Sequence, residues 1–168
     1  MTISMYQASV PVFLRMMNNL VGILEKGMAH AEARKIEPEV LVNARLYPDM
    51  FPMLRQVRIA TDAAMSGAAR LAGMEPPALE NTEMTFPELI GRVRKTIEYL
   101  NTFKPGQIDG SEGRQITLKV RDSTLTFDGL TFLLNRVLPN MYFHITTAYD
   151  ILRHNGVELG KKDYLGKF

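Results

Sequence analysis

Residues 138–157 read LPNMYFHITTAYDILRHNGV. Met141, His144 and Ala148 recur at spacings of three and four residues, so they lie on one face of a helix. Gly156 is the natural residue to end that helix. The stretch therefore predicts a long helix with a histidine on the face that turns toward an apolar core.

Three more segments carry apolar residues at the same helical spacing, at about residues 4–33, 52–72 and 86–103. Thr85 and Glu88 form the sequence pattern of a capping box at the start of the third helix. Four helices with one apolar stripe each predict a helical bundle.

The last helix is expected to begin after Asp128, its cap, and to kink at Pro139. Before it, residues 114–120 and 123–127 alternate apolar and polar side chains, which predicts a β-hairpin. A lone hairpin is marginally stable in water, so it is expected to pack on the bundle or pair with another chain. The fold class is therefore all-α, a four-helix bundle with a small β-hairpin inserted before the last helix, in a single domain of residues 1–168.

The composition is ordinary for a soluble protein, with 46% apolar residues, 23% charged residues and a net charge of +2. No basic cluster indicates a nucleic-acid partner, and no run approaches the roughly 20 apolar residues that span a membrane. The absence of cysteine excludes disulfides and zinc held by thiolates. The N-terminus has no signal-peptide pattern, so a cytoplasmic location is expected. The lysines near the end of the chain, Lys161, Lys162 and Lys167, are interpreted as a solvated tail.

The chain has three histidines, and His144 is the one placed on an apolar stripe. Asn140 lies one helical turn before it, on nearly the same face. A histidine paired with a ligand four residues away is a common metal-binding arrangement, but asparagine binds zinc or nickel weakly. The residues alone therefore favour a buried, hydrogen-bonded histidine over a metal ligand. His154 is interpreted as a helix-end residue, and His30 has no visible partner.

Two other regions supply candidate residues. Gln56 is expected near the mouth of the bundle, and Asp62 on the same helix is expected to form an ion pair with Arg58 rather than act as a buried acid. The loop that holds Tyr47 and Asp49 is either a lid over the bundle mouth or a turn in which Asp49 caps the next helix, and the turn is preferred. No glycine-rich phosphate loop, serine nucleophile motif or Glu-x-x-His pair is present.

The chain resembles the DinB/YfiT-like superfamily of four-helix bundles over nearly its whole length, and within it a bacterial branch of unknown function. The residues that carry the resemblance are Arg45-Leu46-Tyr47-Pro48-Asp49-Met50, Ala69-Arg70-Leu71-Ala72-Gly73, Leu138-Pro139-Asn140, Phe143-His144, Ala148-Tyr149, Ile151-Leu152-Arg153, Asn155-Gly156-Val157, Gly160-Lys161 and Asp163-Tyr164-Leu165-Gly166.

The resemblance implies an up-down-down-up bundle that is often dimeric. It also implies a metal site made of three histidines, one on the second helix and two a turn apart on the fourth. His144 matches the second of the fourth-helix histidines, but Asn140 stands at the first, and Gln56 stands near the second-helix position. Because two of the three family histidines are replaced, His144 is the one remaining metal-ligand candidate. Asn140, Gln56 and His144 together would instead form a neutral polar pocket.

Three functions are weighed on this basis. The preferred one is a small-molecule-binding bundle with a degenerate metal-site pocket around His144, with Asn140, Gln56, Tyr47 and Asp49 as further candidates for contacts to the ligand. The second is a non-catalytic homodimer with a structural or interaction role. The third is a metal-dependent hydrolase or transferase that uses a divalent metal.

Overall fold

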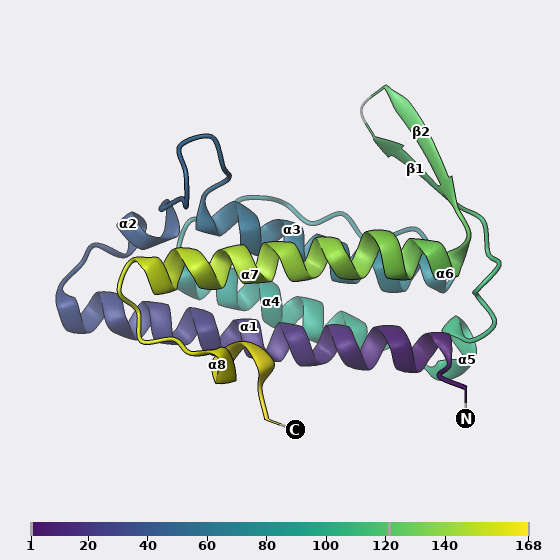
Figure 1. Ribbon diagram of the computed structural model, residues 1–168, viewed down its shortest axis with the longest axis horizontal. Helices are drawn as coiled ribbons and strands as arrows, with labels where there is room; N and C mark the ends of the chain where they lie inside the picture. The colour runs from purple at the N-terminus through teal and green to yellow at the C-terminus, as the bar shows by residue number, and fades with distance from the viewer. Residues whose placement is uncertain (1, 121, 168) are drawn as a thin grey trace.

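The computed structural model describes residues 2–120 and 122–167. Four long helices form the bundle: α1 (Met5–Arg34), α3 (Met53–Leu71), α4 (Phe86–Leu100) and α7 (Leu138–His154). In Figure 1, α7 lies along α3, and α4 lies between these helices and α1. The predicted four-helix bundle is confirmed. No helix of the described ranges is long and apolar enough to cross a membrane.

The directions of the helices follow from their side-chain contacts. Arg92 contacts Thr61 and, one turn later, Thr96 contacts Met65, so α3 and α4 run parallel. By contrast α7 runs antiparallel to α3, because His144 bonds to Gln56 near the start of α3 while Val137, which precedes α7, lies against Gly67 near the end of α3. With α1 antiparallel to α3, the order is up-down-down-up (Figure 1). A long connection between the two parallel helices makes this order possible.

Close packing between α3 and α7 depends on small side chains. Ala60, Ala64 and Ala68 on α3 are fully buried. A Cβ added at Gly67 would lie 2.6 Å from Cγ1 of Val137, so that position accepts only a hydrogen. The stripe of small residues therefore lets the helix that carries His144 approach α3 closely.

The helix ends match their sequence patterns. Thr85 accepts a hydrogen bond from the backbone of Glu88, whose side chain in turn accepts from the backbone of Thr85, as the predicted capping box requires. Two short helices, α2 (Pro38–Val42) and α5 (Pro105–Ile108), each begin with proline, which is well suited to a first helical position.

The last helix is less regular than predicted. Asp128 caps a short helix, α6 (Gly129–Phe132), which continues into a π-helical segment, η1 (Leu133–Val137), before α7 begins. Pro139 cannot donate a backbone hydrogen bond, so the regular pattern cannot continue through it. A π-helical segment lies immediately before this proline, and the kink predicted at Pro139 stays a prediction.

The predicted β-hairpin is confirmed as β1 (Ile116–Val120) and β2 (Ser123–Phe127), paired antiparallel with Ile116 opposite Phe127. Its base is anchored, because Ile116 is buried and Phe127 packs against Phe132 with ring centroids 6.1 Å apart. Figure 1 shows the rest of the hairpin projecting away from the bundle. Residues 123–126 of β2 are exposed accordingly.

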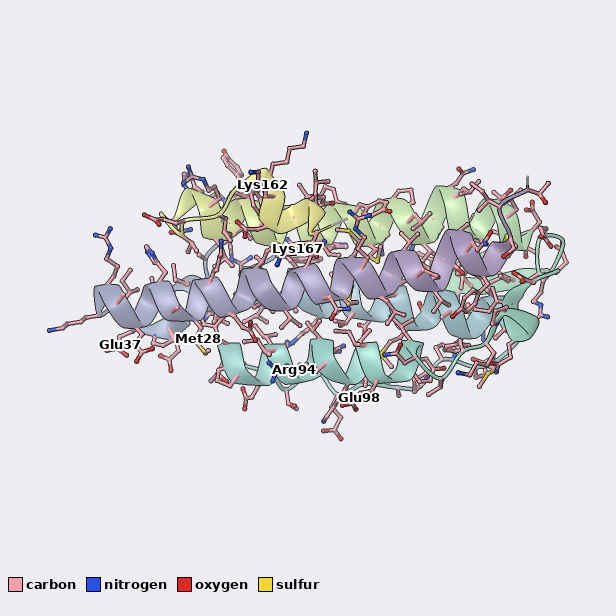
Figure 2. All side chains as sticks on the ribbon, turned by 90° about the horizontal axis from the view of Figure 1, so that it is seen from below. Met28, Glu37, Arg94, Glu98, Lys162 and Lys167 are labelled. Carbon is pink, nitrogen blue, oxygen red and sulfur yellow. The ribbon has the colours of Figure 1, made fainter. Side chains whose placement is uncertain are left out.

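The C-terminal lysines are exposed as expected, but Lys161 and Lys162 belong to a helix rather than to a tail. Residues 161–165 form a helix, α8 (Lys161–Leu165), that lies against α1 (Figure 2). Asn19 donates to the carbonyl of Tyr164 over 2.8 Å, and Arg15 donates twice to the carbonyl of Leu165. A helix of five residues is too short to show periodicity, which is why the sequence did not reveal it.

The contact at Gly67 generates a stability prediction. We expect Gly67→Val to lower the free energy of unfolding by about 1–3 kcal/mol, because the added methyl groups overlap the side chain of Val137. Combining it with Val137→Ala should cost less than the sum of the two single changes. Chemical denaturation of the four proteins measures this, and strictly additive costs would contradict the proposed contact.

Candidate functional site

The centre of the candidate site is a hydrogen bond between α3 and α7. Nδ1 of His144 lies 2.6 Å from Oε1 of Gln56. Both side chains are nearly buried, with 9% of His144 and 2% of Gln56 exposed. The structure thus brings together two of the residues predicted from the sequence, although they are 88 positions apart.

The partners of Gln56 fix the protonation of the imidazole. Nε2 of Gln56 donates to the carbonyl of Phe51 over 2.9 Å, so the amide oxygen is the group that faces His144. An amide oxygen only accepts hydrogen bonds, so Nδ1 of His144 must carry the proton. In the neutral ring the other nitrogen, Nε2, then carries a lone pair.

Nε2 of His144 keeps some exposure to solvent. No hydrogen-bond partner for it exists within residues 2–120 and 122–167. In the same ranges the one fully buried side-chain polar atom without a partner is Oγ of Ser111. Nε2 is therefore not fully enclosed, and a ligand atom or a water molecule can reach it.

Burial also lowers the pKa of His144 below its ordinary value of 6.5, because the charged imidazolium loses hydration. The ring is therefore neutral at pH 7. A neutral histidine that is bonded through Nδ1–H presents Nε2 as a hydrogen-bond acceptor or a metal ligand.

Asn140 does not join this pair. Its side chain instead lines a separate groove of about 170 Å³, together with Asp62, Arg136 and others. Because α7 runs antiparallel to α3, a residue one turn before His144 on α7 lies beside the turn of α3 that follows Gln56. Asn140 therefore faces the turn that holds Ile59 and Asp62 rather than Gln56.

The loop before α3 contributes its backbone rather than its predicted side chains. Tyr47 is 66% exposed, and Asp49 is also exposed. Asp49 does not cap α3, whose N-cap is Pro52 without a side-chain bond, so that prediction is wrong. The functional contact missed from the sequence is the carbonyl of Phe51, which orients Gln56. A backbone contact leaves no residue-type signal in a sequence.

A second polar cluster surrounds Arg92, which is 3% exposed on α4. Its guanidinium contacts Asp62 at 2.5 Å, Glu83 at 2.9 Å and the carbonyl of Glu80 at 2.9 Å. Arg58 also pairs with Glu83, while Asp62 pairs with Arg92, so the predicted Arg58–Asp62 ion pair is wrong and Glu83 is shared by both arginines. This cluster is a clamp on the connection between α3 and α4. Arg92 could have been found from its position on the apolar stripe between Leu89 and Thr96.

The donors around His144 do not fit a tightly held divalent metal. Nδ1 is committed to Gln56, which leaves one imidazole nitrogen, and the neighbouring amide is a weak ligand. No group of three or more histidine, aspartate or glutamate side chains suited to a metal occurs among the described residues. The arrangement suits a hydrogen-bonded ligand better than a three-ligand metal centre.

Comparison with known protein families matches residues 5–165 to the family described as Domain of unknown function (DUF1993). Among solved structures, the chain is similar to a DinB family member protein from Shewanella denitrificans, with 42% sequence identity and a TM-score of 0.87. That similarity covers 97% of this chain and 92% of the other. No curated protein matches the chain. Both similarities include the helices that carry Gln56 and His144.

The environment of His144 predicts a pH-dependent stability. Its pKa is lower in the folded than in the unfolded chain, so the unfolded chain binds more protons below about pH 6.5. The stability that depends on the neutral form of His144 is complete above that pH. It is lost as the pH falls through the pKa of His144 in the folded chain. We expect the stability of the wild type to decrease more steeply with acid than that of His144→Leu.

Nitrogen NMR of the imidazole checks the same point directly. We expect the Nδ1–H tautomer at pH 7 and a titration midpoint below 6.5 for His144. A dominant Nε2–H tautomer, or protonation at a higher pH, would contradict the assigned geometry.

Proposed function

Because the chain belongs to the DUF1993 family and to the DinB-like helical bundles, we propose that it is a small-molecule-binding bundle whose pocket lies around His144. In this proposal the pocket occupies the position of the metal site in other DinB-like bundles, but it has lost the set of three histidines. The observation that carries the proposal is the unpaired Nε2 of a nearly buried, neutral histidine.

The state of His144 defines one requirement for the ligand. A lone pair at Nε2 accepts a hydrogen bond, so the ligand must donate through an O–H or N–H group. Since Gln56 fixes the ring orientation and the amide of Gln56 is itself fixed by Phe51, the acceptor is preorganised. Preorganisation reduces the entropy lost when a ligand binds.

The aromatic side chains near the pair suggest a second requirement. Phe143 is 57% exposed and packs edge-on against His144, with ring centroids 5.2 Å apart. Phe51 is 39% exposed, and the guanidinium of Arg55 lies 3.6 Å from its ring centroid. The exposed ring of Phe143 beside this oriented imidazole favours a ligand with a flat apolar body and a single donor group.

Phenol is a suitable probe, because it combines a flat ring with one O–H donor. We expect phenol to shift the His144 resonances in a saturable manner, and anisole, which lacks the donor, to bind about tenfold more weakly. His144→Leu should abolish the preference for phenol. NMR titration of the full chain measures all three effects.

Gln56→Leu serves as the matched variant for the orientation of the ring. It leaves His144 in place but removes the acceptor that fixes its tautomer, so phenol should bind more weakly than to the wild type. Equal binding of phenol and anisole to the wild type, or unchanged binding to His144→Leu, would refute the proposed pocket.

The alternative of a metal-dependent hydrolase or transferase has its own test. The single available imidazole nitrogen leads us to expect substoichiometric transition metal in protein purified without a histidine tag. Elemental analysis decides this. Stoichiometric zinc, nickel or manganese that is lost in His144→Ala would favour the metalloenzyme over the present proposal.

The homodimer expected from the sequence remains a prediction, and we propose the projecting hairpin as its contact. Residues 123–126 are exposed, and one of them, Leu125, is a large apolar residue that is 39% exposed. An exposed strand edge favours pairing with a second strand. Sedimentation velocity at micromolar concentrations should show a dimer that Leu125→Lys weakens, and a monomeric wild type would reject the prediction.

A further inference from the structure

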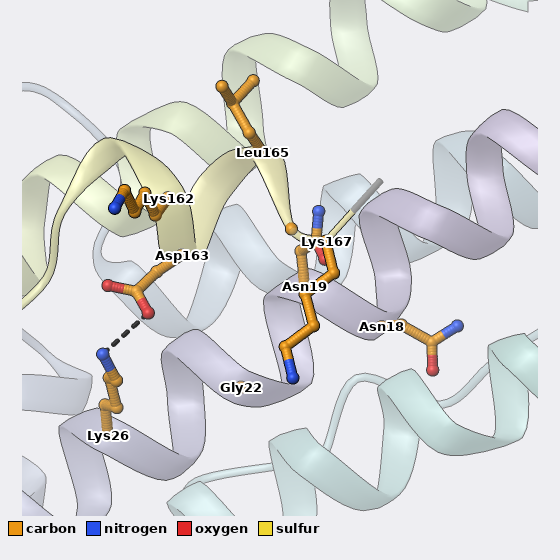
Figure 3. Close-up of a pocket in the computed structure, with 9 residues that line it drawn as sticks. Asn18, Asn19, Gly22, Lys26, Lys162, Asp163, Leu165 and Lys167 are labelled. Atoms are coloured by element: carbon orange, nitrogen blue, oxygen red, sulfur yellow. Dashed lines mark hydrogen bonds and ion pairs between the residues drawn. The ribbon is translucent and has the colours of Figure 1, made fainter.

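A groove separates the C-terminal helix α8 from α1. It has a volume of about 620 Å³, which lies within the range of small-molecule sites. Figure 3 shows one wall formed by successive turns of α1, with Asn19, Gly22 and Lys26. The other wall comes from α8 and the residues after it, with Lys162 and Lys167. It is distinct from the site around His144, which shares none of its lining residues.

Gly22 is the most informative residue of this groove. It lies in the interior of a 30-residue helix, where glycine is among the least favourable residues. A Cβ built at Gly22 would meet nothing within 4 Å, so neither close packing nor an unusual backbone angle requires glycine there. The lack of a side chain keeps the floor of the groove open.

The second wall is built rather than incidental. The side-chain amide of Asn19 donates to the carbonyl of Tyr164, and a Cβ at Gly166 would come within 2.3 Å of Oδ1 of Asn19. Gly166 has a φ of +74°, a conformation that other residues rarely adopt. The chain is therefore held firmly against α1 at this point, and the groove has a defined width.

The charges of the groove are unequal. Asp163 is its one acid, and it is paired with Lys26 at 2.7 Å. Lys162 and Lys167 have no ion-pair partner in the described part of the chain. Figure 2 shows both lysines on the same side of the bundle, close to α8. This excess of positive charge beside the open floor at Gly22 favours an anion that is small enough to lie in the groove.

We propose that this groove binds a small organic carboxylate. Its carboxylate group is held by Lys167, whose side chain reaches toward Gly22, and Lys162 adds positive charge at the rim. Its short apolar chain lies over Gly22. Hexanoate is the probe with this chemistry. Acetate has the same charge without the chain, and inorganic phosphate has charge alone, so these two anions separate specific binding from general attraction to lysines.

The test is a calorimetric titration of the full chain with the three anions. We expect saturable binding of hexanoate at least tenfold tighter than that of acetate or phosphate. Gly22→Leu fills the floor of the groove and should weaken hexanoate binding at least tenfold. It should also raise the melting temperature by about 2–4 °C, because leucine replaces glycine within a helix without a clash.

Gly91→Leu is the matched control. Gly91 also lies inside a helix with nothing within 4 Å of a built Cβ, but it is on α4 and away from this groove. We expect the same gain in melting temperature with unchanged hexanoate affinity. The double variant Lys162→Gln/Lys167→Gln should weaken hexanoate binding about tenfold without filling the groove.

Two results would overturn the proposal. One is wild-type affinity for hexanoate in both Gly22→Leu and the double lysine variant. The other is equal affinity of the wild type for hexanoate, acetate and phosphate, which would indicate general attraction of anions only. If Gly22→Leu does not fold, wild-type affinity for hexanoate in the double lysine variant alone would overturn the proposal. Neither result bears on the pocket around His144, which is tested by phenol.

Discussion

The hydrogen bond between Gln56 and His144 is the interaction on which the candidate site depends. A histidine on the apolar face of a helix is stable there only when its buried nitrogen has a partner. Gln56 supplies that partner from the opposite helix, and the carbonyl of Phe51 orients Gln56 in turn. The result is a short chain of bonds from a loop through α3 to α7. It holds one nitrogen inside and leaves the other accessible.

This arrangement requires the bundle to have its particular topology. Parallel α3 and α4 need a long connection, and Arg92 binds that connection through Glu80 and Glu83 while it also contacts Asp62 on α3. A buried guanidinium satisfied by several acceptors fixes such a connection specifically, since loss of any acceptor would leave charge uncompensated. The contacts of Arg92 therefore hold α4 against α3, and the bond between Gln56 and His144 holds α7 against α3.

Much of the fold could be predicted because each element repeats a pattern over many residues. The four helices show a period near 3.6 residues, the hairpin shows alternation, and the capping box at Thr85 marks a helix start. The helix α8 and the π-helical segment could not be predicted, because five residues carry no measurable period. Of the site, the superfamily resemblance placed Gln56 and His144 in one polar pocket, and the structure brings the two into contact. Asn140 lines the groove beside Asp62, a detail that helical phase does not supply, because phase does not say which turn of a neighbouring helix a side chain meets.

A double-mutant cycle on Gln56 and His144 measures the strength of their hydrogen bond. Either single change to leucine leaves the other buried polar group without its partner, whereas the double change removes both groups. We predict that the double variant is more stable than the sum of the single costs implies, with a coupling energy of about 1–2 kcal/mol. Additive costs, with a coupling energy within about 0.5 kcal/mol of zero, would contradict the hydrogen bond on which the site rests.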